Sequence, residues 1–116
     1  MNKEILQKRT KRFALEIIRL VDTLPKNKSA DVLGRQLLRS ATSVAANYRA
    51  ACRGRSKAEF IAKLGIVVEE ADESLFWLEL MKEAGLVPPE RLHPLIQEAN
   101  ELTAIFVASR KTAQKR

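Results

Sequence analysis

Four long stretches of this sequence carry apolar residues at the three- and four-residue spacing that lines one face of an α-helix. The chain has four glycines and four prolines, of which Pro25, Gly54, Gly85 and Pro88 lie between these stretches. The pattern predicts helices over residues 3–24, 29–53, 56–84 and 89–109. Because the connections are short, successive helices are expected to lie side by side in opposite directions. The predicted fold class is therefore all-α, an up-down-up-down antiparallel four-helix bundle in one domain, residues 1–116.

Local signals mark the expected ends of these helices. Ser29 is predicted to cap the second helix, and Gly54 follows its last residue. Ser56 and Glu59 have the spacing of a capping box at the start of the third helix, and Gly85 ends that helix. A proline pair opens the fourth helix, and the basic tail over residues 110–116 is expected to fray.

Composition and rare residues narrow the class of protein. Apolar residues make up 46% of the chain and charged residues 30%, as in ordinary globular domains. No apolar run approaches the roughly 20 residues that span a bilayer, and the start of the chain has no apolar signal-peptide region. A cytoplasmic protein without membrane association is therefore expected.

The candidate chemical groups are few. Cys52 is the only cysteine and is expected to be a small buried apolar residue, while His93, the only histidine, is expected to be structural or exposed. Asn47 is interpreted as a structural hydrogen-bonding residue between helices. Since no second His, Cys pair, Glu-x-x-His motif or Gly-rich phosphate loop is present, we expect no metal, no cofactor, no catalytic residue and no enzymatic activity.

Positive charge is concentrated in the first two helices. The second helix carries an arginine row, which spans an arc of about 80° opposite the apolar face and consists of Arg35, Arg39, Arg49 and Arg53. Arg55 and Lys57 extend this row into the next turn. The first helix adds Lys3, Lys8, Arg9, Lys11 and Arg12. Dense like charge favours a polyanionic partner, RNA or DNA, bound nonspecifically through its phosphates.

The third helix differs from the others in charge and in apolar pattern. Residues 56–84 hold three lysines against seven Asp and Glu residues, a net charge of −4 in a chain whose net charge is +7. Opposite its core face lies a second partly apolar seam, made up of Ile66, Glu69, Glu70, Glu73, Phe76, Trp77 and Leu80. We predict that this seam is an oligomer interface. The alternative is that the two aromatic residues fold over the flank of their own bundle.

Two functional hypotheses follow from these charges. In the first, a non-enzymatic homo-oligomeric bundle binds RNA or DNA through its basic surface. In the alternative, the arginines form intersubunit ion pairs with the acids of the third helix, and the assembly is a scaffold for a protein partner with no nucleic-acid role.

The stretch QLLRSATSVAANYRAACRGRSKAEFIAKLGIVVEEADESLFWLELMKEAGL, residues 36–86, resembles the bacterial four helix bundle protein family. This family is also called the 23S rRNA intervening-sequence protein family, because some members are encoded within 23S rRNA genes. The likeness continues through EANELTAIFVASRKTA near the C-terminus and covers nearly the whole chain.

This resemblance implies a ring-like homopentamer of small bundles, in a family without an assigned biochemical activity. The chain is also distantly similar to the accessory proteins of diversity-generating retroelements, whose basic pentameric barrels bind nucleic acid and a reverse transcriptase. Where many relatives carry a glutamate near the end of the second helix, this chain has Ala50 and Ala51, which makes its arginine row more uniformly positive.

Overall fold

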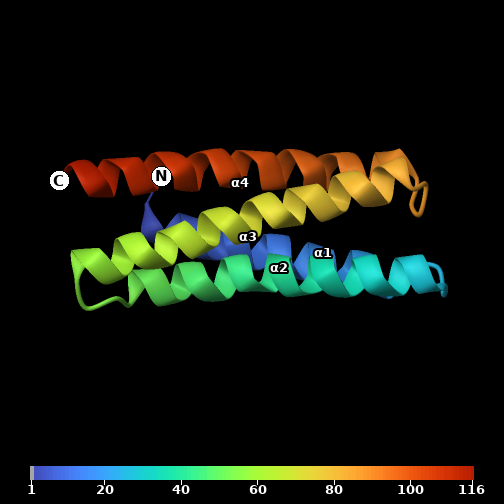
Figure 1. Cartoon of the computed structure of the whole chain (residues 1–116), viewed down its shortest axis with the longest axis horizontal. Coiled ribbons are helices and arrows are strands. Elements are labelled where there is room, and N and C mark those ends of the chain that lie inside the picture. The colour runs from blue at the N-terminus through green and yellow to red at the C-terminus, as the bar shows by residue number, and fades with distance from the viewer. Residues whose placement is uncertain (1) are drawn as a thin grey trace.

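The computed structural model describes residues 2–116, and this part of the chain is all-α. Its helices are α1 (Lys3–Asp22), α2 (Lys28–Cys52), α3 (Lys57–Glu83) and α4 (Pro89–Lys115). They lie along the long axis of a body of 47 × 19 × 19 Å, and each runs opposite to the one before it (Figure 1). The predicted four-helix bundle is confirmed. Both chain termini and the α2–α3 connection lie at the same end of the bundle (Figure 1).

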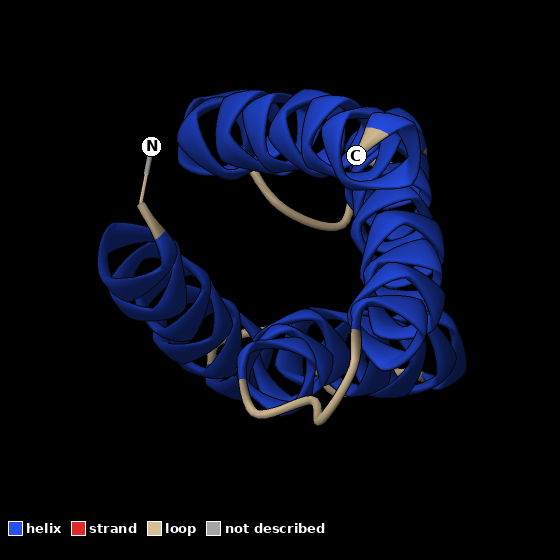
Figure 2. Ribbon diagram, turned by 90° about the vertical axis from the view of Figure 1, so that its left-hand side faces the viewer, coloured by secondary structure: helices blue, strands red, loops and turns tan. Residues whose placement is uncertain are grey.

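The helices pack in chain order around one core. The contacts of α2 with α1 and α3, and of α3 with α4, are extensive, whereas α1 contacts α4 over a much smaller area. Figure 2 looks along the bundle from the end that holds both termini, and its most open edge lies between α1 and α4. The α1–α4 seam is therefore the least tightly packed of the four.

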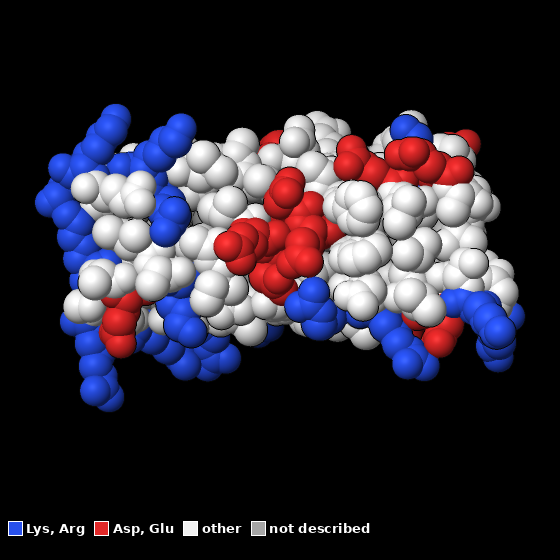
Figure 3. Space-filling view, in the orientation of Figure 1, with Lys and Arg blue, Asp and Glu red and all other residues white. Residues whose placement is uncertain are grey.

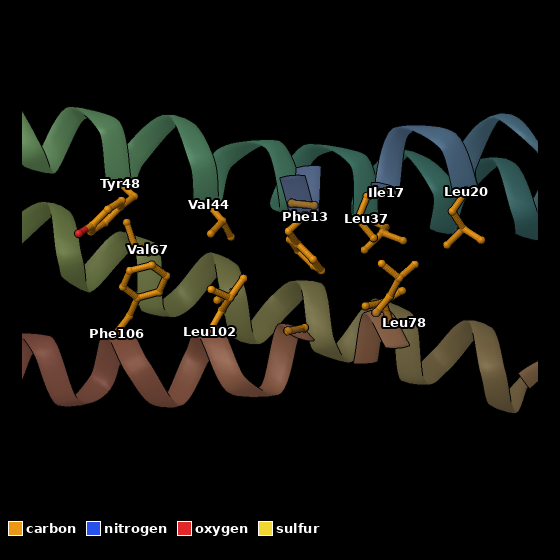
Figure 4. Packing of buried hydrophobic residues seen from close by; sticks show 14 of the residues in the cluster. Phe13, Ile17, Leu20, Leu37, Val44, Tyr48, Val67, Leu78, Leu102 and Phe106 are labelled. Atoms are coloured by element: carbon orange, nitrogen blue, oxygen red, sulfur yellow. The ribbon is translucent and has the colours of Figure 1, made fainter. Parts of the chain in front are cut away.

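The predicted apolar faces of the four helices meet in this core. Figure 4 shows side chains from all four helices pointing toward one another, among them Phe13, Leu37, Leu78 and Leu102. Each of these four is at most 1% exposed. The rings of Tyr48 and Phe106 also contact each other, with centroids 4.9 Å apart. All four helices therefore contribute to one closely packed core.

Small residues allow α2 and α3 to approach closely. The hydroxyl groups of Ser40 on α2 and Ser74 on α3 are buried and lie 3.2 Å apart. Each hydroxyl also donates to a backbone carbonyl of its own helix, so neither is left without a hydrogen bond. The structure thus places the alanine- and serine-rich part of the sequence at the most extensive helix contact.

Two of the predicted helix ends need correction at the residue level. The side chain that caps α2 is Asn27, whose Oδ1 accepts from the Ala30 amide at 2.8 Å, so the prediction of Ser29 as the cap was wrong. At α3, Ser56 accepts from the Glu59 amide as predicted. The Glu59 carboxylate, however, accepts from the amide of Arg55, one residue before the position that a reciprocal capping box requires.

The fourth helix extends further than predicted. It continues to Lys115, so the expected frayed tail over residues 110–116 was wrong. Arg110 ties this extension to α3, because its Nε donates to the Ile61 carbonyl at 3.2 Å. Gly65 makes room for this side chain, since a Cβ at that position would lie 3.2 Å from Nη2 of Arg110.

Candidate nucleic-acid interface

Lysine and arginine side chains gather at the end of the bundle that holds both termini, shown at the left of Figure 3. A recess of about 470 Å³ lies at this basic end, and its cationic lining residues are Lys3, Arg55, Lys57 and Arg116. They come from the start of α1, the α2–α3 connection, the first residue of α3 and the last residue of the chain. The contribution of Arg116 was missed in the sequence, because the tail was not expected to be helical.

A second basic hollow lies between α1 and α2. This α1–α2 groove has a volume of about 540 Å³ and is lined by Gln7, Lys8, Lys11, Thr42, Ala45, Ala46, Arg49 and Arg53. It brings four of the predicted contact residues together from two helices. The small residues between the cations keep the groove open, so that its charges line a hollow rather than a flat face.

Most of the cations that line the groove have no carboxylate partner in the part of the chain that the structure describes. Within residues 2–116, no carboxylate lies within ion-pair distance of Lys11, Arg49 or Arg53. Lys8 pairs with Glu4 at 3.5 Å, but both side chains are about 80% exposed, and such pairs are weak. The groove is therefore a site of net positive charge.

Two predicted contact residues are instead held by carboxylates of the same chain. Arg39 lies 3.2 Å from a carboxylate oxygen of Glu70 and 3.7 Å from one of Glu73, both on α3. Arg9 donates from Nε and Nη2 to the two carboxylate oxygens of Glu98 on α4, each at 2.7 Å. A further bond of 3.0 Å joins Arg9 to Glu101. The alternative hypothesis from the sequence has the arginines pair with acids of the third helix in another subunit, whereas the Arg39 pair lies within one chain.

The Arg9 contacts cross the loosely packed α1–α4 seam. The hydrogen bonds to Glu98 and then Glu101 raise the pKa of the Arg9 guanidinium above its already high ordinary value, so this charge is permanent. Of the remaining predicted contact residues, Arg35 pairs with Asp31 at 3.0 Å on the exposed surface of α2, and Arg12 is exposed on α1.

The acidic centre of the bundle lies on the outer face of α3, where red atoms cluster in the middle of Figure 3. Glu70 is only 8% exposed, whereas Glu69 is exposed and Glu73 is half-exposed. A hydrogen bond with Glu70 is the main cause that raises the pKa of Glu73, and partial desolvation and the Glu70 charge add to it. Two carboxylates thus share Arg39 within one chain.

The apolar residues of the α3 seam divide into two groups. Phe76 is 53% exposed and Ile66 39% exposed, so both face outward. Trp77 and Leu80 are half-buried, and Trp77 packs against the core of its own bundle. The indole Nε1 of Trp77 is buried without a hydrogen-bond partner among the described residues. The structure therefore leaves Phe76 and Ile66 as the apolar part of this seam that a partner could cover.

The remaining singled-out residues have local roles. Cys52 is half-buried rather than fully buried as expected, and His93 is exposed. Asn47 donates from Nδ2 to the carbonyl and to the hydroxyl of Ser43, at 3.0 and 2.7 Å. Since both residues lie on α2, the prediction of a hydrogen bond between helices was wrong. In residues 2–116, no three His, Cys, Asp or Glu side chains are grouped so that they could hold a metal ion.

Fold and charge define a small four-helix bundle whose cations are concentrated at one end and in one groove. The chain belongs to the 23S rRNA-intervening sequence protein family, whose model matches residues 2–108. It is also similar to a protein of unknown function from the S23 ribosomal protein family of Bacteroides thetaiotaomicron VPI-5482, known from a crystal structure. The two chains share 31% identity with a TM-score of 0.88, over 96% of this chain and 99% of that one.

No curated protein matches this chain. In the described part of the chain, no helix combines the length and the apolar character that crossing a membrane requires.

Proposed function

We propose that this protein is a non-enzymatic, homo-oligomeric helical bundle that binds RNA or DNA nonspecifically through phosphate contacts. The observation that carries the proposal is the α1–α2 groove, where Lys11, Arg49 and Arg53 have no carboxylate partner in residues 2–116. Cations held this close together repel one another, and a phosphate backbone relieves that repulsion while releasing its own counterions.

The proposed surface joins the groove to the basic end, because Arg53 and Arg55 lie between the last residue of α2 and Lys57, the first residue of α3. Arg9 and Arg39 are left out of it, since α4 and α3 carboxylates bind them. The proposed contact residues are Lys3, Lys8, Lys11, Arg49, Arg53, Arg55, Lys57 and Arg116.

The test is fluorescence anisotropy with a labelled RNA hairpin and a labelled DNA duplex at 50 mM salt. We expect both to bind, with an affinity that falls steeply as salt is raised. The freshly purified protein should also carry an excess absorbance at 260 nm that nuclease removes. If neither probe binds at low salt, the proposal is wrong.

The homo-oligomer in this proposal is a ring, with five subunits implied by the family resemblance. The outward-facing Phe76 and Ile66 support burial of the α3 face against another copy. Replacing both with glutamate should keep the helical circular dichroism and lower the mass seen by light scattering. The matched control is Leu15→Glu, a residue of α1 that is 43% exposed. An unchanged mass in the α3 variant would exclude this face.

The second candidate function is a protein-interaction scaffold without a nucleic-acid role. It is favoured by the ion pairs of Arg39 with Glu70 and Glu73, because they leave one arginine of the row less available to phosphates. The exposed ring of Phe76 also favours it. A protein that co-purifies at a fixed stoichiometry after nuclease treatment, combined with no binding to either probe, would support the scaffold and refute the first candidate.

A further inference from the structure

The aromatic residues of this chain lie away from its exposed cations. The chain has six of them, and Phe13, Tyr48 and Phe106 are at most 2% exposed in the core. Phe76 and Trp77 lie on α3, in the segment that carries the acidic cluster, and Phe76 faces outward whereas Trp77 packs against the core. None of these five residues lines the α1–α2 groove or the recess at the basic end.

Phe60 lines the recess at the basic end. It is half-buried, and Nζ of Lys3 lies 4.6 Å from the centroid of its ring. This cation covers a face of the ring that a nucleic-acid base would need for stacking. The α1–α2 groove, in contrast, offers charge and hydrogen-bond donors without an aromatic residue among the described residues that line it.

Proteins that hold single strands nonspecifically combine a basic groove with aromatic rings on which the bases stack. A surface without such rings gains little from unpaired bases. Its affinity depends on the phosphates, and a duplex carries one charge per about 1.7 Å of axis, against about 3.4 Å for each strand alone. Phosphate-only recognition thus favours the nucleic acid with the denser charge.

We propose that the α1–α2 groove binds base-paired nucleic acid in preference to single strands, through phosphates alone. The inference rests on the proposed function and names its substrate class. Arg49 and Arg53 are one helical turn apart, about 6 Å along α2, and Lys8 and Lys11 line the same groove from α1. Four cations on two walls neutralise a strand's phosphates while the paired bases stay outside the groove.

The size of the preference follows from these four groove cations. For four neutralised phosphates, affinity varies with salt to a power of about −3.6 for a duplex and about −2.8 for a single strand. With equal affinity at 1 M salt as the reference, a duplex is expected to bind about tenfold more tightly at 50 mM salt.

The experiment measures anisotropy over a salt series with four probes of about 20 nucleotides, whose length covers about two turns of duplex: a DNA duplex, an RNA duplex and one unstructured strand of each. The inference is supported if the duplexes bind tighter than their strands, whichever of RNA or DNA binds better. Strands that bind equally well or better overturn the inference while the proposed function stands. If no probe binds, the proposed function itself fails.

Two variants locate the effect. Arg49→Gln/Arg53→Gln should lower the salt slope on duplex by about 1.8. The matched control is Arg19→Gln/Lys26→Gln, which removes the same charge from two exposed residues away from the groove and should leave the slope unchanged. Equal effects of the two variants overturn the assignment to the groove. A selective loss of single-strand binding in Phe60→Leu also overturns the inference, because it reveals base stacking on that ring.

Discussion

Arg9 provides the sharpest test of the distinction between cations that are paired with carboxylates of the protein and cations that line the groove. The guanidinium makes two hydrogen bonds of 2.7 Å to Glu98, and the two side chains are only 21% and 26% exposed. Hydrogen bonds to charged groups contribute about 1.5–3 kcal/mol when buried, whereas fully exposed ion pairs contribute about 0–1 kcal/mol. Since both side chains are mostly covered, we expect Arg9→Met to lower the free energy of unfolding by about 2 kcal/mol.

Thermal or urea unfolding followed by circular dichroism measures this loss. Unfolding entropy of about 2.1 cal/mol/K per residue makes 2 kcal/mol equivalent to a fall in Tm of about 8 °C for a chain of this length. A double-mutant cycle with Glu98→Gln isolates the contribution of the pair itself. The exposed pair of Lys8 and Glu4 serves as the control, and its coupling energy should lie within experimental error.

The same variants separate structural from ligand-binding cations. Arg9→Met/Glu98→Gln keeps the net charge of the chain, and we expect it to leave the salt slope of nucleic-acid binding unchanged. Lys8→Gln/Lys11→Gln should lower that slope by about 1.8, because two groove cations are lost. The reasoning is refuted if Arg9→Met leaves Tm unchanged and the charge-neutral double variant lowers the slope as the lysine pair does.

The remaining predictions concern stability. The hydrogen bond with Glu70 raises the pKa of Glu73, so the folded state favours the protonated acid. The stability that the protonated acid contributes is fully present below the unfolded-state pKa and is lost as pH rises through the folded-state pKa. Glu73→Gln should therefore stabilise the protein at pH 7 and have little effect at pH 4 in urea unfolding, and a pH-independent difference would contradict this. Gly85 has a φ of +69° with open space around it, so Gly85→Ala should cost about 1 kcal/mol by thermal unfolding, from backbone strain alone. Asn27→Ala should cost about 1 kcal/mol through loss of the α2 cap, while Ser29→Ala should leave the stability nearly unchanged.

Apolar periodicity was sufficient to predict the four helices, because each helix buries one continuous stripe against its neighbours. The ends were less predictable, since several residues near one end can serve as caps. Asn27 and Ser29 are both good capping residues two positions apart, and only the path of the chain after α1 selects Asn27. The last turns of α4 include a contact that is remote in sequence, the Arg110 side chain over Gly65, which the periodicity of α4 does not reveal.

The sequence was sufficient to predict which basic residues share a helix face, but not which of them are paired with carboxylates. The helical wheel correctly separates the arginine row from the core face of α2, but it does not say which carboxylates a neighbouring helix places beside each arginine. Arg39 meets Glu70, whereas Arg49, on the same face of the same helix, has no carboxylate within ion-pair distance in residues 2–116. These pairings depend on how the helices are staggered, and the sequence pattern does not fix that stagger.

The arginine–carboxylate pairs and the proposed nucleic-acid surface are compatible, because they use different residues. Acids of α3 and α4 neutralise Arg39 and Arg9, so positive charge is reduced along the middle of the bundle and along the α1–α4 seam. The cations that remain without carboxylates lie in the α1–α2 groove and at the basic end. A phosphate that enters the groove displaces no internal ion pair apart from the weak one between Lys8 and Glu4. The internal pairs thus confine the attraction for a polyanion to one part of the surface instead of competing with it.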